Sequence, residues 1–278
     1  MSTLVTRVRY GVWDGWTMTR RYLTHVVRSP EEIAIYFSVP LLFVLVFGYV
    51  LSAAMVVPDG GDYREFLLPG VFVMSMVYGL GATAIAVATD VGRGVVDRFR
   101  ALPVARSALL VGRGTADLLR AVLEVTVLVG CGVLIGWRVR GSVAETAAAV
   151  ALLLWLRFAL SWVGIWLGLR LRNPDLVGVI VFPLAFPLTA LSNILVAPEL
   201  MPGWVGTVAE WNPLSATAAA ARELFGNPGA GGETWPAQHP VLLAALWPLL
   251  LVMVFTPLAV RQYRGWGIDP PSAPAVVR

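Results

Sequence analysis

The sequence predicts an all-α membrane protein, and three observations support this prediction. Of the 278 residues, 58% are hydrophobic and only 14% are charged, and the mean hydropathy of +0.74 is far above that of a water-soluble domain. The apolar residues form runs long enough to cross a bilayer, which takes about 20 residues. Runs of this length without alternation are typical of helices, since barrel strands need only about ten alternating residues.

Six apolar runs reach this length, and we expect each to form a transmembrane helix. They cover residues 33–57, 67–89, 115–136, 146–169, 174–197 and 240–262. Together they define one six-helix domain over residues 33–262, with an N-terminal cytoplasmic segment, residues 1–32, before it and a cytoplasmic tail, residues 263–278, after it.

The distribution of arginine predicts the orientation of these helices. All 21 basic residues are arginine, and most fall before the first span, in the loop after the second, just after the fourth, or in the tail. The loops of the opposite side hold only Arg64, Arg138, Arg140 and Arg222. The positive-inside rule therefore places both termini and the loop after the second span in the cytoplasm, with the chain in the inner or plasma membrane.

The same composition argues against several classes of function. The net charge of +4 comes from loop arginines and does not indicate a nucleic-acid partner. The chain has no lysine and therefore no P-loop of its own. Its single cysteine, Cys131, excludes an intrachain disulfide, and its two histidines, His25 and His239, lie on opposite sides in the predicted topology. We expect no catalytic residues, metal site or cofactor in this chain.

Residues 10–31 precede the first span and mix aromatic and aliphatic residues with Arg20, Arg21 and Arg28. This pattern is typical of an interfacial helix that lies along the lipids of the inner leaflet. A solvated cytoplasmic helix is the alternative.

The connection between the fifth and sixth spans, residues 198–239, is too polar to cross the membrane. Within it, "WNPLSATAAAARELFG" has the signals of a helix: Asn212 as N-cap, Pro213 at the first helical position, and Gly226 as the C-terminal stop. We expect one or two short helices here, Arg222 included, that enter or rest on the outer leaflet.

Four charged residues fall on one face at the start of the third predicted helix. Arg113, Asp117, Arg120 and Glu124 are spaced so that Arg113 can pair with Asp117 and Arg120 with Glu124. Because a charge near the bilayer centre costs about 3 kcal/mol or more, such side chains face protein or water. They either neutralise one another at the membrane interface or form a polar seam that links the cytoplasmic loop to a moving helix.

Arg157 lies in the middle of the fourth predicted helix and has no acidic residue near it in that helix. It is expected to face the bundle interior, a neighbouring subunit or a translocation path, with Glu124 as a plausible partner. A structural ion pair and a role in the path are both open. Two GxxxG patterns, at Gly132–Gly136 and Gly164–Gly168, are weak signals of close helix packing.

Three stretches of the sequence carry a resemblance to a known family. They are "VVDRFRALPVARSALLVGRGTADLLRAV" at residues 95–122, "RSPEEIAIYFSVPLLFVLVFGYVL" at residues 28–51, and "WNPLSATAAAARELFG" at residues 211–226. In order, spacing and hydropathy they resemble ABC-2 type permeases, the membrane subunits of ABC exporters of the daunorubicin-resistance kind. Together they cover the chain from about residue 28 to residue 262.

The resemblance implies a role for the charged loop after the second span. In such permeases this loop forms a cytoplasmic coupling helix that docks on a separate ATPase subunit. The contact residues here would be Asp97, Arg98, Arg100, Leu102, Pro103 and Arg106. Arginines suit this role, since they pair bidentately with carboxylates, and a proline fixes a rigid corner. An ordinary loop that only sets topology is the alternative.

The resemblance also implies an assembly of two permeases and two ATPases, with ATP and Mg²⁺ bound by the partner ATPase. We therefore expect the permease half of an exporter for amphipathic or hydrophobic compounds, working by alternating exposure of a cleft between two subunits. The alternatives are export of a lipid or lipid-linked glycan, and a membrane assembly or regulatory protein that transports nothing.

Overall fold

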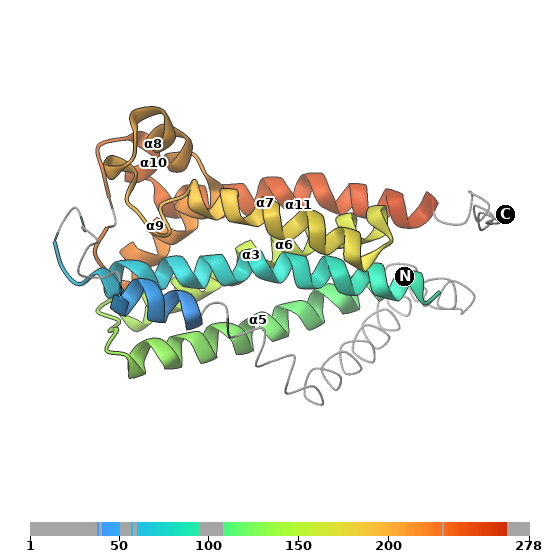
Figure 1. The fold of residues 1–278 in the computed structure, drawn as a ribbon, viewed down its shortest axis with the longest axis horizontal. Helices are drawn as coiled ribbons and strands as arrows, with labels where there is room; N and C mark the ends of the chain where they lie inside the picture. Colours follow the sequence, from blue (N-terminus) through green and yellow to red (C-terminus); the bar gives the residue numbers. More distant parts are fainter. Residues whose placement is uncertain are drawn as a thin grey trace, which may run out of the picture.

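The computed structural model describes residues 38, 41–50, 57, 60–94, 108–229 and 231–265, and every regular element in these ranges is helical (Figure 1). The predicted all-α fold is therefore confirmed for this part of the chain. The expected interfacial segment, residues 10–31, and the expected coupling residues, 97–106, lie outside the described ranges, as does the tail beyond residue 265.

Five long helices form the body of the protein and run along its longest axis (Figure 1). They are α3 (Tyr63–Gly92), α5 (Ala108–Leu134), α6 (Val143–Leu171), α7 (Pro174–Ala190) and α11 (Pro240–Gly265). Among the described residues, α3, α6 and α11 are long and apolar enough to cross a membrane. The 30 residues of α3 extend over about 45 Å, more than the ~30 Å hydrocarbon layer.

Shorter elements gather at one end of the bundle, at the left of Figure 1. They are η3 (Pro198–Leu200), α8 (Gly203–Glu210), α9 (Pro213–Phe225) and α10 (Trp235–Gln238). We call residues 191–239, which contain these four elements, the cap. Of the first predicted span, 33–57, the structure describes a helix over Leu41–Val50 that ends in a π-helical turn, η1 (Val46–Val50).

The fifth predicted helix is shorter than expected, because α7 ends at Ala190 and not at residue 197. Arg222 Nη2, from α9, donates to the carbonyl oxygens of Asn193 at 2.8 Å and Ile194 at 3.3 Å. These carbonyls are thus occupied by a side chain and not by the amides of a continuing helix. The end of this apolar run is therefore part of the cap, where Ile194 is fully buried.

α3 is the central helix of the bundle, and it contacts α5, α6, α7 and α9. One of the two GxxxG patterns marks its closest neighbour. A Cβ atom at Gly164 of α6 would lie 2.8 Å from the Leu80 carbonyl oxygen, and one at Gly168 would lie 2.5 Å from that of Ala84. The predicted close packing is confirmed at this pair of glycines, because a side chain at either would push α6 away from α3.

The other pattern, Gly132–Gly136, has a different role. Gly136 follows the end of α5 and has a φ of 101°, a conformation that favours glycine. Its amide donates to the Val133 carbonyl oxygen at 3.2 Å. This glycine therefore ends a helix and does not bring two helices together.

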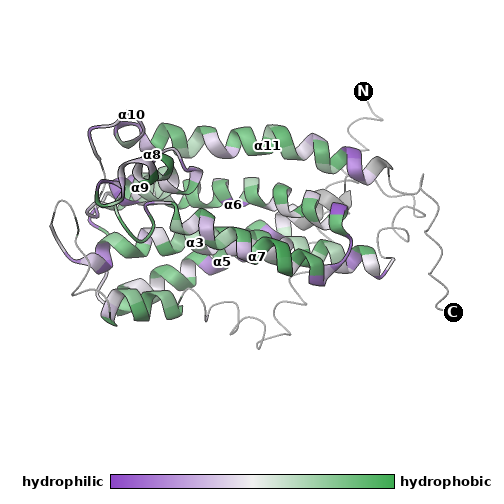
Figure 2. Ribbon diagram, turned by 45° about the horizontal axis from the view of Figure 1, so that its top comes forward, coloured by the Kyte–Doolittle hydropathy of each residue, from purple (hydrophilic) through white to green (hydrophobic). Residues whose placement is uncertain are grey.

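Apolar side chains also cover the outside of the bundle. α7 and α11 expose many of them, including Val179 at 71% and Met253 at 58%. Hydrophobic residues dominate the middle of the bundle and hydrophilic ones gather toward its two ends (Figure 2). In water such a surface would favour aggregation, whereas lipid tails or a second apolar subunit can cover it.

Candidate functional site

A buried ion pair joins α6 to α5 in the core of the bundle. Arg157 of α6 donates two hydrogen bonds to the carboxylate of Asp117 on α5, Nε to Oδ2 at 2.9 Å and Nη2 to Oδ1 at 2.6 Å. The side chain of Arg157 is fully buried and that of Asp117 is 8% exposed. A bidentate pair of this kind is the strongest geometry available to an arginine and a carboxylate.

α3 completes this cluster with two further hydrogen bonds. Thr83 Oγ1 donates to Asp117 Oδ1 at 2.8 Å, and Arg157 Nη1 donates to the Met76 carbonyl oxygen at 3.2 Å. Removing two charges from water is costly, and the mutual attraction offsets that cost only when extra hydrogen bonds are present. The cluster meets this condition, so it can hold α3, α5 and α6 in one register.

A glycine on α3 makes room for the guanidinium group. A Cβ atom at Gly79 would stand 0.9 Å from Arg157 Nη1 and 2.0 Å from its Cζ. No other residue type fits this position while the ion pair is intact. Gly79 and Thr83 lie one helical turn apart on α3. Neither residue could be predicted from the sequence, since single Gly and Thr residues in an apolar helix carry no specific signal.

The structure places the other charged residues of α5 as follows. Glu124, the partner that the sequence suggested for Arg157, lies two turns further along α5 and is 1% exposed. The bidentate partner is instead Asp117, which the sequence paired with Arg113. Arg120 is half-buried, and the side chain of Arg113 lies outside the described part of α5. The Arg157–Asp117 pairing depends on the rotation of α5 about its axis, which helical spacing alone does not determine.

Near the start of α3 lies α9, and the capping residues predicted for this helix are confirmed. Asn212 is the N-cap, where its Oδ1 accepts from the Leu214 amide at 2.9 Å, and Pro213 is the first helical residue. Gly226 follows the last turn in the left-handed conformation, with a φ of 69°. Asn212 also has a tertiary role, since its Nδ2 donates to the Leu191 carbonyl oxygen at 2.7 Å.

Arg222 fastens α9 to α3 and to the segment after α7. It is fully buried, its Nε donates to the Phe66 carbonyl oxygen at 2.8 Å, and its Nη2 donates to Asn193 and Ile194 as described above. Its guanidinium carbon lies 3.7 Å from the centre of the Phe66 ring. Burial lowers the pKa of Arg222 to about 9, while Tyr63 raises it, so the group stays protonated at neutral pH.

An ion pair attaches the α5–α6 connection to the start of α3, and a tryptophan and a backbone amide attach it to the cap. Arg140 Nη2 lies 2.8 Å from Glu65 Oε1, and the amide of Arg140 donates to the Phe225 carbonyl oxygen at 2.8 Å. Trp137, which is 1% exposed, donates to Asn227 Oδ1 at 2.9 Å. The cap and the start of α3 therefore form one connected unit.

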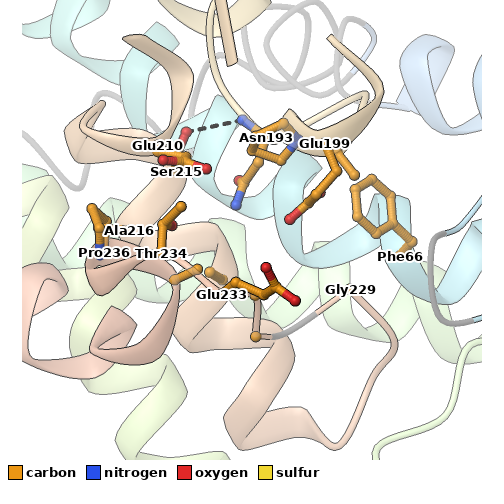
Figure 3. A pocket seen from close by; sticks show the side chains of 16 residues that line it. Phe66, Asn193, Glu199, Glu210, Ser215, Ala216, Gly229, Glu233, Thr234 and Pro236 are labelled. Carbon is orange, nitrogen blue, oxygen red and sulfur yellow. Dashed lines mark hydrogen bonds between the residues drawn. The ribbon is translucent and has the colours of Figure 1, made fainter. Parts of the chain in front are cut away.

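A cavity of about 450 Å³ opens within the cap, between the segment after α7, α9 and the loop before α10 (Figure 3). Phe66 and four alanines form apolar parts of its wall, and Glu199, Glu210 and Glu233 line it as well. A volume of this size is in the range of small-molecule sites. The lining belongs to the same end of the bundle as the N-terminus of α3.

The chain is thus a multi-pass helical membrane protein with a polar core cluster and a folded cap. The sequence profile of the ABC-2 type transporter family matches residues 15–225. Daunorubicin resistance ABC transporter permease protein DrrB1 of Streptomyces coeruleorubidus is 34% identical over 249 residues, which cover 87% of this chain and 85% of that protein. Probable doxorubicin resistance ABC transporter permease protein DrrC of Mycobacterium tuberculosis, from two strains, is 25% identical over 249 residues, which cover 88% of this chain and 87% of that protein.

The chain therefore belongs to the ABC-2 type transporter family. The resemblance drawn from the sequence is confirmed, and with it the expectation of a permease subunit without an ATPase of its own. Family membership implies an ABC ATPase as partner.

Proposed function

We propose that this chain is the membrane subunit of an ATP-driven exporter that moves amphipathic or hydrophobic compounds, drug-like or lipid-like, out of the cell. The observation that carries the proposal is the 34% identity to a daunorubicin resistance permease over 87% of the chain. The proposed assembly contains two copies of this permease and two ABC ATPase subunits, each of which binds ATP and Mg²⁺. We also propose six spans with both termini in the cytoplasm, as the distribution of arginine predicts.

The proposed coupling element is the segment from Asp97 to Arg106. Its contact residues are Asp97, Arg98, Arg100, Leu102, Pro103 and Arg106. It follows α3, the helix that begins at the cap and contributes to the Arg157 cluster. A push on this segment is therefore transmitted along one continuous helix to the opposite end of the bundle, and ATP-driven closure shifts the balance between inward-facing and outward-facing states.

Co-purification with the ATPase tests the coupling element. We expect the double charge reversal Arg98→Glu, Arg100→Glu to abolish co-purification of the ATPase, while the permease still inserts into the membrane. Arg261→Glu is a matched control, because this exposed arginine near the end of α11 lies at the same end of the bundle as the end of α3 (Figure 1). Undiminished co-purification of the double variant would remove the docking claim.

Transport in proteoliposomes that contain the permease and its ATPase tests the function itself. ATP-dependent movement of an amphipathic dye supports the proposed exporter. Movement of a fluorescent lipid without movement of dyes indicates the lipid-export alternative. ATP hydrolysis without movement of any compound in a broad panel indicates a membrane protein with an assembly or regulatory role.

A further inference from the structure

We propose that the turn between α6 and α7 binds the phosphate group of an anionic lipid, whose acyl chains lie along the exposed face of α7. The inference concerns the end of the bundle opposite the cap. It goes beyond the proposed transport function and does not depend on it. Arg170 and Arg172 provide the charge, and the apolar side chains at the start of α7 provide the rest of the surface.

The end of the bundle opposite the cap is positively charged. The buried side chains of Val91, Leu169 and Tyr263 belong to one apolar cluster, so the last turns of α3, α6 and α11 pack together there. The exposed arginines of these helix ends are Arg93, Arg170, Arg172 and Arg261. The described acidic residues at the same end are Asp90 and Asp175. The net charge is therefore positive and attracts an anionic partner.

The turn between α6 and α7 holds two of these arginines. At the end of α6, the amide of Arg172 donates to the Gly168 carbonyl oxygen at 3.1 Å. Asn173 caps α7, because its Oδ1 accepts from the Asp175 amide at 2.9 Å. Only Arg172 and Asn173 separate the two helices. The turn is therefore short and capped on both sides, and it keeps the backbone of Arg170 and Arg172 at one edge of the bundle.

Arg172 has a backbone conformation that costs stability. Its φ of 60° is the only positive value among the described residues other than glycine. A side chain makes this left-handed conformation unfavourable, and glycine is the usual residue at such a helix end. The fold by itself would therefore favour glycine here. A role for the exposed guanidinium group explains the arginine.

An apolar surface begins within one helical turn of these arginines. On α7, Leu176 is 50% exposed and Val179 is 71% exposed, while Val177 faces the bundle and is fully buried. A phosphate group beside Arg170 and Arg172 is thus followed directly by a surface for hydrocarbon chains. A lipid has a charged and an apolar part in this order, whereas an acidic protein segment would need only the charge.

The level of the turn in the membrane agrees with a lipid headgroup. The 29 residues of α6 extend over about 43 Å, more than the ~30 Å hydrocarbon layer, so its end reaches the headgroup layer. Hydrophilic residues mark this end of the bundle (Figure 2). Basic residues at this level attract anionic headgroups, and a phosphate accepts the paired N–H groups of an arginine.

The test measures lipid binding to the full-length permease in dodecylmaltoside micelles, without the ATPase. The probe is phosphatidylglycerol with a fluorescent label on one acyl chain. Its matched control is phosphatidylcholine with the same label, in which the choline group cancels the charge of the phosphate. We expect saturable binding, with at least tenfold higher affinity for phosphatidylglycerol and a preference that falls as salt is added. Equal affinity for the two lipids would overturn the proposal.

Charge variants locate the binding. Arg170→Gln, Arg172→Gln is expected to reduce the preference for phosphatidylglycerol at least fivefold, whereas Arg170→Lys, Arg172→Lys keeps the charge and should retain most of it. Arg138→Gln is the control, since Arg138 is an exposed arginine near the cap, and it should leave the preference unchanged. An unchanged preference in the glutamine double variant, or an equal loss in Arg138→Gln, would refute the site.

Arg172→Gly tests the same site with a change that relieves the backbone. We expect a melting midpoint no lower than that of the wild type, together with a preference for phosphatidylglycerol at least threefold weaker. This variant also keeps the test decisive if the glutamine double variant does not fold. A preference equal to that of the wild type would contradict the role assigned to the arginine.

Further outcomes separate a lipid from other anionic partners. Glycerol 1-phosphate should not displace the labelled lipid, because it has no acyl chains, and displacement as efficient as that by unlabelled phosphatidylglycerol would contradict the role of α7. A glutamine double variant that keeps its lipid preference but no longer co-purifies with the ATPase would assign the turn to a protein contact and overturn the inference. Lost transport with intact lipid binding contradicts the proposed function alone, while intact transport without lipid preference contradicts only this inference.

Discussion

Gly79 of α3 faces the guanidinium group of Arg157 on α6 so closely that a Cβ atom at this glycine would overlap Nη1. The same guanidinium holds Asp117 of α5 through two hydrogen bonds. The missing side chain on one helix is therefore the condition for an ion pair between two others. The core of this permease is organised around a charge that only a glycine leaves room for.

Gly79→Ala is expected to lower the free energy of unfolding by about 3–5 kcal/mol, because the added methyl group displaces Arg157 from Asp117 and breaks a buried ion pair. Thermal unfolding of the detergent-solubilised protein, followed by size-exclusion chromatography, measures the change. The control is Gly178→Ala in α7, where a Cβ atom meets nothing within 4 Å. A melting midpoint for Gly79→Ala equal to that of the control would show that the core rearranges at no cost.

A double-mutant cycle tests how Arg157 and Asp117 depend on each other. Arg157→Met and Asp117→Leu should each cost about 3–5 kcal/mol, because each removes the bidentate partner of a buried charge, whereas the double variant should cost less than the sum. Additive losses would contradict the pairing. Transport by a stable double variant then separates the two roles left open by the sequence. Retained transport makes the pair structural, and lost transport places it in the transport cycle.

Arg222→Leu should loosen the cap, because it leaves the carbonyl oxygens of Phe66 and Asn193 without their donor. Hydrogen bonds to charged groups contribute about 1.5–3 kcal/mol each, so we expect a loss of at least ~3 kcal/mol. Hydrogen exchange should rise first in residues 191–197, which are held by this side chain. The comparison is Arg64→Leu, whose ion pair with Asp62 is exposed and should contribute about 1 kcal/mol or less. Similar exchange in the two variants would contradict the anchoring role.

Labelling of introduced cysteines tests the proposed topology. In a Cys131→Ala background, Val143→Cys should react with a membrane-impermeant maleimide in intact cells, since Val143 is 89% exposed at the start of α6, on the cap side of the bundle. Arg98→Cys should react only after the membrane is permeabilised. The opposite pattern would invert the topology, and with it the assignment of Asp97–Arg106 to the ATPase side.

The local features of this chain could be predicted from its sequence. The hydropathy runs located α3, α6 and α11, and a capping asparagine, a first-turn proline and a stop glycine located α9, because these signals act over a few neighbouring residues. The family could also be recognised from the sequence, because three short stretches resemble it in their order and spacing along the chain.

The contacts between distant segments needed the tertiary structure. Asp117 and Arg157 are 40 residues apart. From the sequence, helical spacing paired Asp117 with Arg113, and Glu124 was the suggested partner of Arg157. The early end of α7 depends on Arg222, which reaches back to Asn193 from α9. The sequence by itself thus determined which segments are helical and apolar, since hydrophobic pattern and capping are local. Only the packed bundle decided which buried charges meet, because that depends on how each helix is rotated against the others.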